Sequence, residues 1–183
     1  CDMKATGIVR RIDDLGRVVI PKEIRRTLRL KEGTPLEIFT DREGEIILKK
    51  YSPMVELTAF AGQYAESMAQ TTGMMVCITD RDQVIAAAGG PRKEILQKNI
   101  SKQLEQAIDD RETIVAGKGD KQFIPLTDDE EGITAELIAP IICEGDAIGA
   151  VALLGRDARA KFGEAEVKLA GTAAGFLGRQ MEG

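Results

Sequence analysis

Within the first fifty residues, short segments follow one another and are separated by turn residues, glycine and proline, and this pattern limits the possible folds more than any other feature of the sequence. Residues 6–12 alternate roughly between apolar and polar side chains, which predicts a strand, and residues 17–20 are mostly β-branched, which predicts another. Pro21 has no N–H for a β-ladder and suits the first turn of a helix, so we expect a short helix over residues 22–30, ended by Gly33. Two further strands, joined by a hairpin turn, are expected over residues 36–40 and 45–49.

Such a segment is expected to be weak as a monomer. Four short strands and a two-turn helix bury little surface, and no covalent or metal staple is available to compensate. Histidine is absent, and the three cysteines, Cys1, Cys77 and Cys143, show no paired spacing. We therefore expect two chains to combine their strands in one barrel-like core, as an obligate dimer.

The charge of the chain is divided unevenly. Its net charge is −5, yet residues 1–52 hold twelve Lys and Arg against nine Asp and Glu, whereas the remainder holds thirteen against twenty-one. Within residues 4–31, nine basic residues stand against three acidic ones. A basic head on an acidic body is the asymmetry expected if only the head meets a polyanion such as DNA. A solvated surface with a chance cluster of charges is the alternative.

The absence of histidine also excludes several chemistries. No Ser-His-Asp or Cys-His catalytic arrangement and no His-ligated zinc or haem is possible, and isolated cysteines cannot form a four-thiolate site. We expect no metal and no cofactor. No apolar run approaches the roughly eighteen residues of a membrane span, and unpaired cysteines indicate a reducing compartment. We therefore expect a cytoplasmic protein without a membrane partner, with Met3 as its natural initiator.

Two stretches of the head carry a specific resemblance. The sequence GRVVIPKEIRRTL, from Gly16 to Leu28, and the later EIILKKY, from Glu45 to Tyr51, closely resemble the AbrB family of transition-state regulators. The resemblance covers nearly all of residues 3–52 and implies a domain-swapped dimer of looped hairpins that binds double-stranded DNA. It also implies readout of DNA shape besides base contacts, since the family lacks a simple consensus operator.

In the AbrB family the DNA contacts come mainly from arginines, and the resemblance assigns that role to four positions here, with one lysine as a weaker candidate. These residues are Arg10, Arg17, Arg25, Arg26 and Lys4. Guanidinium groups neutralise phosphates and can bridge guanine O6 and N7. Arg11 is doubtful because successive strand residues face opposite ways. For each arginine the alternative is a surface ion pair with Asp13, Asp14, Glu23 or Glu32.

Residues 53–183 predict a second domain with an α+β plan, after a boundary at residues 51–53. Apolar spacings of three and four predict helices, the first of which packs either on a sheet or against another subunit. Alternating and β-branched runs predict a largely antiparallel sheet. Helices are expected over residues 54–68, 93–111 and 164–181, and strands over residues 75–80, 84–88, 114–115, 123–126, 135–142 and 147–154.

The sequence PIICEGDAIGAVALLG, from Pro140 to Gly155, resembles GAF domains. The expected architecture is therefore two-domain. An AbrB-like swapped-hairpin β-barrel dimer occupies residues 1–52, and an α+β GAF-like domain with a central antiparallel sheet flanked by helices occupies residues 53–183. This order of domains resembles a family of regulators in spore-forming bacteria. It implies a homo-oligomer, with a dimer formed through the head and a tetramer formed through the GAF-like domain.

GAF-like domains often bind small molecules between the sheet and its overlying loops. An effector of unknown identity is therefore one expectation for this domain, and a module for oligomerisation alone is the other. Residues 117–120 and 128–132 are either loops over such a pocket or plain surface loops.

Three functions remain open at this point. The first is a transcription regulator of sporulation-stage genes, an activator or repressor assembled or regulated through its body. The second is an antitoxin that neutralises a partner toxin, although the strand-rich body differs from the short disordered tails of antitoxins. The third is reduction of methionine sulfoxide by clustered cysteines, which requires Cys77 and Cys143 to approach one another. Inert, buried cysteines are the commoner outcome, so we expect no enzyme activity.

Overall fold

The computed structural model describes residues 3–51, 54 and 57–182 of the chain. These form two compact units, residues 1–51 and residues 52–183, which we call the head and the body. Residues 52 and 53, where the sequence predicts the domain boundary, lie outside the described residues. Each unit is described by itself below.

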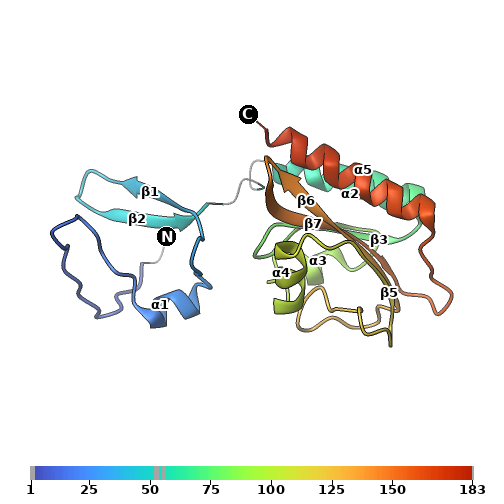
Figure 1. Ribbon diagram of the computed structural model, residues 1–183, viewed down its shortest axis with the longest axis horizontal. Helices are drawn as coiled ribbons and strands as arrows, with labels where there is room; N and C mark the ends of the chain where they lie inside the picture. The colour runs from blue at the N-terminus through green and yellow to red at the C-terminus, as the bar shows by residue number, and fades with distance from the viewer. Residues whose placement is uncertain (1–2, 52–53, 55–56, 183) are drawn as a thin grey trace. The chain divides into compact units, whose positions relative to one another are not determined.

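The head contains one helix and one hairpin. Helix α1 spans Lys22–Thr27, and strands β1 (Leu36–Thr40) and β2 (Ile46–Lys50) pair antiparallel, which confirms the predicted hairpin (Figure 1). The turn between the strands is held by Asp41, whose Oδ1 accepts hydrogen bonds from the backbone N–H groups of Glu43 and Glu45, both at 2.9 Å. An Asp at the start of a turn commonly acts in this way.

Helix α1 is shorter than the sequence predicts. It ends at Thr27, because Arg29 adopts a left-handed conformation with φ of 56°. The N–H of Leu30 then donates to the carbonyl of Arg25 at 2.7 Å, a reversal that satisfies a carbonyl at the end of the helix. The prediction of a helix up to residue 30 was wrong because the chain turns back well before Gly33.

The two predicted strands at residues 6–12 and 17–20 belong to no β-ladder among the described residues. The turn between them is nevertheless formed. The Asp13 side chain accepts the Arg17 N–H at 2.7 Å, and Gly16 has a φ of 76°, which glycine adopts at little cost. A strand is stabilised by hydrogen bonds to a neighbour, and within one chain these two segments have no neighbouring strand. A ladder for these segments would need a neighbouring strand that the described residues of one chain do not supply.

The body is built on a five-stranded antiparallel sheet with the strand order β4-β3-β7-β6-β5. Its long central hairpin, β6 and β7, turns at Glu144 and Gly145, as the sequence predicts. The strands are β3 (Met75–Thr79), β4 (Val84–Ala88), β5 (Ile114–Gly117), β6 (Ala135–Cys143) and β7 (Asp146–Gly155), and the helices are α2 (Thr58–Thr72), α3 (Arg92–Ile95), α4 (Lys102–Asp109) and α5 (Glu164–Gln180).

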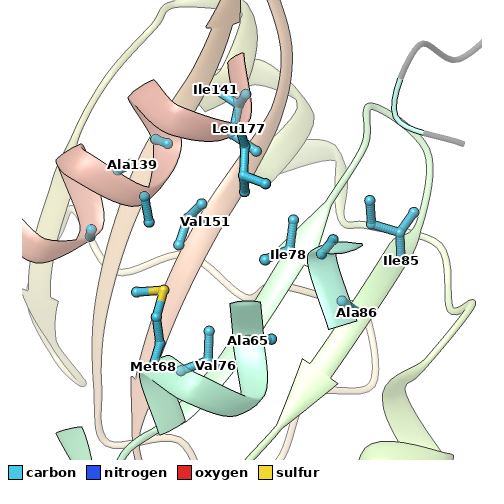
Figure 2. Packing of buried hydrophobic residues seen from close by; sticks show 14 of the residues in the cluster. Ala65, Met68, Val76, Ile78, Ile85, Ala86, Ala139, Ile141, Val151 and Leu177 are labelled. Carbon is cyan, nitrogen blue, oxygen red and sulfur yellow. The ribbon is translucent and has the colours of Figure 1, made fainter. Parts of the chain in front are cut away.

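The sheet separates two apolar cores. Helices α2 and α5 cover one face, where Met68, Ile78, Val151 and Leu177 pack together (Figures 1 and 2). Helix α4 and the loops that precede and follow it cover the opposite face. Almost every residue of β3, β4 and β7 is buried, because both faces of these strands are covered.

Two predictions for the body were wrong. The single helix expected over residues 93–111 is two helices, α3 and α4, because the backbone of Val84 hydrogen-bonds residues 97 and 98 and draws the chain out of helical geometry. Ser101 then caps the start of α4 by accepting the Leu104 N–H at 3.0 Å. Residues 123–126 are not a strand, since their N–H and C=O groups bond to side chains and to Ser101 rather than to a ladder.

The contact between α5 and β6 depends on a glycine. A Cβ atom at Gly178 would lie 2.1 Å from the carbonyl oxygen of Ile142, whereas a Cβ at Gly171 of the same helix meets nothing within 4 Å. We expect Gly178→Ala to lower the free energy of unfolding of the body by about 1–3 kcal/mol, because the helix must move off the sheet. Gly171→Ala is the matched control and should raise it by up to about 1 kcal/mol. Urea unfolding of both variants checks this, and equal effects would contradict the proposed close packing.

Candidate nucleic-acid interface and ligand pocket

The head exposes most of its apolar side chains. Pro21 is the only buried residue in its described part. Twelve of the fifteen large apolar side chains exposed among the described residues belong to the head, which means that one copy of this unit has no core of its own. They are Met3, Val9, Ile12, Leu15, Val18, Val19, Leu28, Ile38, Phe39, Ile46, Leu48 and Tyr51.

Five of these side chains also line an open cavity of about 750 Å³, namely Val18, Val19, Leu28, Ile46 and Leu48. Its apolar lining comes from the extended segments before and after the turn at Asp13, from α1 and from the β1–β2 hairpin. We call residues 3–12 the first extended segment and residues 17–20 the second. The lining includes Ile8, Val18, Ile20, Ile24, Leu28, Leu36, Ile46 and Leu48. An exposed apolar concavity of this size is normally covered by another protein surface. The cavity therefore leaves apolar surface of the head uncovered in a single chain.

All five predicted DNA-contacting residues of the head are exposed, and they lie on three segments. Lys4 and Arg10 belong to the first extended segment, and Arg10 also borders the cavity, with its Nη1 donating to the carbonyl of Val9 at 3.0 Å. Arg25 and Arg26 are neighbours on α1, and neither side chain is buried. One chain therefore places Arg25 and Arg26 side by side on α1, whereas Lys4 and Arg10 share another segment and Arg17 lies on a third.

Arg17 makes the surface ion pair that the sequence analysis left open as an alternative. Its Nε donates to Asp13 Oδ2 at 2.7 Å, and the two side chains are 68% and 37% exposed. The backbone N–H and the side chain of Arg17 hold the pKa of Asp13 below its ordinary value. An exposed pair of this kind contributes little to stability, because water screens the two charges. The pair thus orients the Arg17 guanidinium at the turn and leaves most of its surface accessible.

The body has a cavity of about 420 Å³ on the face of the sheet that α4 covers. Met75 of β3 and Leu154 of β7 contribute apolar surface from the sheet. The loop at residues 127–133 contributes Asp129, Glu130 and Glu131, so the loop predicted at residues 128–132 does lie over a pocket. Residues 117–120, the other predicted loop, do not line it.

A buried carboxyl group lies beside this cavity. Glu136 of β6 is fully buried, and it pairs with Leu154 in the sheet register. Its Oε1 accepts the N–H of Ile124 at 2.7 Å, while its Oε2 has no hydrogen-bond partner among the described residues. Burial raises the pKa of Glu136 to about 7, and the charge of nearby Glu130 adds to the rise. Burial also raises the pKa of Glu130.

Sequence reasoning did not find Glu130 or Glu136. A signal for Glu136 was present, since it is the single charged residue in the apolar run from Ala135 to Ile142. A carboxylate inside a strand that is covered on both faces requires a specific partner or a proton.

The two cysteines of the body do not approach one another. Cys77 belongs to the apolar core on one face of the sheet and Cys143 to the core on the other. Cys77 also pairs with Ala152 and Cys143 with Asp146, six residues apart along β7, or roughly 20 Å at 3.3 Å per residue. Burial raises the pKa of Cys77 to about 12. The structure therefore contradicts a dithiol site made from this pair.

Three carboxylates of the β1–β2 turn, Asp41, Glu43 and Glu45, lie within 4.8 Å of one another. The Asp41 carboxylate is already engaged by backbone N–H groups of the turn, and this bonding lowers its pKa. We assign this cluster a role in the turn and no ligand.

The raised pKa of Glu136 predicts a pH-dependent stability. Between its ordinary value of 4.5 and about 7, the folded protein holds a proton that the unfolded chain has lost. Stability must therefore fall as the pH rises through this window, with a slope of up to about 1.4 kcal/mol per unit. Glu136→Gln should remove most of this slope, leaving the part due to Glu130, while Glu112→Gln on the surface should leave it unchanged. Thermal unfolding between pH 4.5 and 8 measures the slope, and identical profiles for all three proteins would contradict the assignment.

Among the described residues, no helix is both long and apolar enough to cross a membrane.

Comparison with protein families gives two matches, which meet between residues 55 and 56, close to the boundary between the head and the body. The family described as stage V sporulation protein T C-terminal, transcription factor, matches residues 56–182. The family described as antidote-toxin recognition MazE, bacterial antitoxin, matches residues 9–55.

Two relatives from Bacillus subtilis (strain 168) are similar in sequence. Stage V sporulation protein T is 52% identical over 181 residues, which covers 98% of this chain and 99% of the relative. The transition state regulatory protein AbrB is 65% identical over 51 residues, which covers 28% of this chain and 52% of AbrB. The first match spans both units, and the second spans the head alone.

Solved structures confirm the fold of the body. The GAF domain of the Acinetobacter phosphoenolpyruvate-protein phosphotransferase aligns with a TM-score of 0.57 and 12% identity, covering 68% of this chain and 81% of that one. The GAF domain of the nutrient sensor CodY from Clostridium difficile gives a TM-score of 0.51 and 14% identity, covering 70% and 93%. Identities this low establish a common fold and nothing further.

The predicted two-domain architecture, with an AbrB-like head and a GAF-like body, is thus confirmed. The full-length match and the C-terminal family match agree with each other. This chain belongs to the stage V sporulation protein T family of transcription regulators.

Proposed function

We propose that this chain regulates sporulation-stage genes by binding double-stranded DNA through its head, as a dimer, in the cytoplasm. The observation that carries the proposal is the head itself. Five basic side chains at the positions that the AbrB resemblance assigns to DNA are exposed, on a unit whose apolar residues lack a core. Two copies that join their apolar cavities would bury those residues and double the positive charge of one particle.

The arginines supply the binding energy in this proposal. Guanidinium groups neutralise phosphates, and the release of counterions makes the affinity fall steeply with salt. A bidentate contact to guanine O6 and N7 gives base readout, while deformation of the duplex gives shape readout. Arg25 and Arg26 are the strongest candidates, since they stand side by side on α1 and no ion pair is seen for either among the described residues.

Replacing these two arginines tests the proposal. We expect Arg25→Ala and Arg26→Ala each to abolish duplex binding at physiological salt while leaving the head folded and dimeric, because neither side chain is buried. Arg42→Ala in the β1–β2 turn removes one exposed charge from the same unit and is the control, with an expected loss below about threefold. Fluorescence anisotropy with a promoter duplex, paired with light scattering, measures both properties. Retained affinity in both variants would show that the site assignment is wrong.

The body supports the second part of the proposal, in which it assembles dimers into a tetramer. On the outer side of α2 and α5, the rings of Phe60 and Tyr64 lie 5.7 and 5.6 Å from that of Phe176. Phe60 is 41% and Phe176 37% exposed, so part of this aromatic patch faces solvent in a single chain. Aromatic side chains of this kind are enriched at protein interfaces.

Light scattering on the full chain tests the aromatic patch. We expect a tetramer for the wild type and a dimer for Phe60→Ser/Phe176→Ser, because the substitutions replace apolar contact area with hydroxyl groups that must be desolvated. Val115→Ser alters an exposed apolar residue of β5 instead and should stay tetrameric. A dimeric wild type would remove the tetramer from the proposal.

Regulation by a small effector completes the proposal and is supported by the cavity of the body, whose volume is within the usual range of ligand sites. An antitoxin function is the alternative, since the head matches an antitoxin family over residues 9–55. The folded body counts against it, because the full-length relative matches on both units. Co-purification of a small toxin with the full chain would favour the alternative.

A further inference from the structure

The row of side chains that crosses the sheet beside the body cavity is unusual in its chemistry. Met75, Leu154 and Glu136 are directly paired on adjacent strands β3, β7 and β6, so their side chains stand on the same face. Met75 and Leu154 line the cavity, and Glu136 is the next residue in the row. A fully buried carboxyl group, with one oxygen unpartnered among the described residues, thus lies one strand away from an apolar wall.

The charges around this cavity are predominantly negative. Four carboxylates line it, Glu94, Asp129, Glu130 and Glu131, against the two cations Lys98 and Arg156. Lys98 is already engaged in an ion pair with Asp129, and this contact lowers the pKa of Asp129. Apart from this ion pair, the lining carries three carboxylates and one cation, Arg156. The carboxyl group of Glu136 lies next to the lining and is not included in this count.

Apart from Thr127, the remaining walls of the cavity are apolar. Pro91, Ile95 and Ile133 complete the surface that Met75 and Leu154 begin. A hydrated metal ion gains nothing from such walls, whereas an organic molecule buries its carbon chain against them. An anionic ligand would meet the excess of carboxylates. The lining therefore selects for a compound that carries a positive charge at one end and an apolar chain at the other.

We propose that this cavity binds a small organic ammonium compound, whose charged group contacts Glu130 and whose apolar chain lies against Met75, Ile95, Ile133 and Leu154. Glu136 does not itself line the cavity, and the Ile124 N–H holds its carboxyl group next to Leu154 of the wall. We assign it the role of a positioning residue. This inference deepens the effector-binding part of the proposed function and rests on it, and it is independent of how the head binds DNA.

Binding of the ammonium group should release protons. Burial raises the pKa of both Glu130 and Glu136, and the charge of Glu130 raises that of Glu136 further, so a cation beside Glu130 favours the charged form of both. The other ionisable group affected by Glu130 is Cys77 of β3, and the strand neighbours of Glu136, Leu154 and Ala116, are apolar. An alkylammonium group keeps its charge up to about pH 10. Affinity should therefore rise with pH between about 5.5 and 8.

The experiment is calorimetry on the full-length protein with three probes that share one branched carbon chain. Isoamylamine carries the ammonium group alone, L-leucine adds a carboxylate that Arg156 can meet, and isovalerate carries only a carboxylate. We expect isoamylamine, L-leucine or both to bind, with proton release, and isovalerate not to bind. If L-leucine binds more tightly and Arg156→Ala removes its advantage, the ligand is an amino acid; if isoamylamine binds more tightly, it is a simple amine.

Variants separate the site from general effects on folding. Glu130→Gln keeps an acceptor for the Leu126 N–H but removes the charge, and should weaken binding at least about tenfold. Asp128→Asn, in the same loop but outside the lining, is the matched control and should bind as the wild type does. Glu136→Gln should still bind but lose most of the pH dependence of affinity.

Three results would overturn the proposal. They are binding of isovalerate as tight as that of the cationic probes, no binding of either cationic probe by the folded protein, and wild-type affinity in Glu130→Gln. Because no DNA is present in the calorimeter, each of these outcomes is distinguishable from a failure of the DNA-binding proposal.

Discussion

The head of this protein cannot bury its own apolar side chains, and the rest of the account depends on that constraint. In its described part only Pro21 is buried. An apolar cavity of about 750 Å³ opens between the two extended segments on either side of Asp13, α1 and the β1–β2 hairpin. Leaving such a unit uncovered forgoes the free energy that burial of apolar surface contributes to the folding of a small domain. In the proposed dimer, a second copy would supply both the missing core and the missing ladder partners of residues 6–12 and 17–20. Dimerisation and the presentation of arginines then follow from one arrangement.

The body solves the opposite problem. Its sheet is covered on both faces, yet the two faces differ in chemistry. The face under α2 and α5 is apolar, and close contacts such as that of Gly178 with Ile142 hold the helices to it. The other face holds Glu136 and a cavity bordered by carboxylates. With helices on one face and an ionisable pocket on the other, the body could assemble the proposed oligomer through the aromatic patch of α2 and α5 and take a ligand through the pocket.

Local patterns predicted the elements whose partners are near in sequence. The β1–β2 hairpin, the β6–β7 hairpin and α5 lie where alternation and helical spacing indicate, because each pattern reports one continuous face. Predictions were wrong where a distant backbone decides the conformation. Val84 interrupts the helix expected over residues 93–111, and residues 123–126 bond to side chains. The arginines of the head were predicted through a family resemblance, whereas Glu130 and Glu136 were missed because burial and proximity arise only on folding.

Hydrogen exchange of the head as a function of protein concentration tests the central claim most directly. In one chain, the amides of residues 6–12 and 17–20 have no β-ladder to protect them. If two chains share one core, these amides are protected at concentrations where the dimer forms, and their protection is lost on dilution together with that of β1 and β2. Protection that does not depend on concentration, or amides that exchange freely in a particle shown to be dimeric, would contradict the claim that two chains share one core.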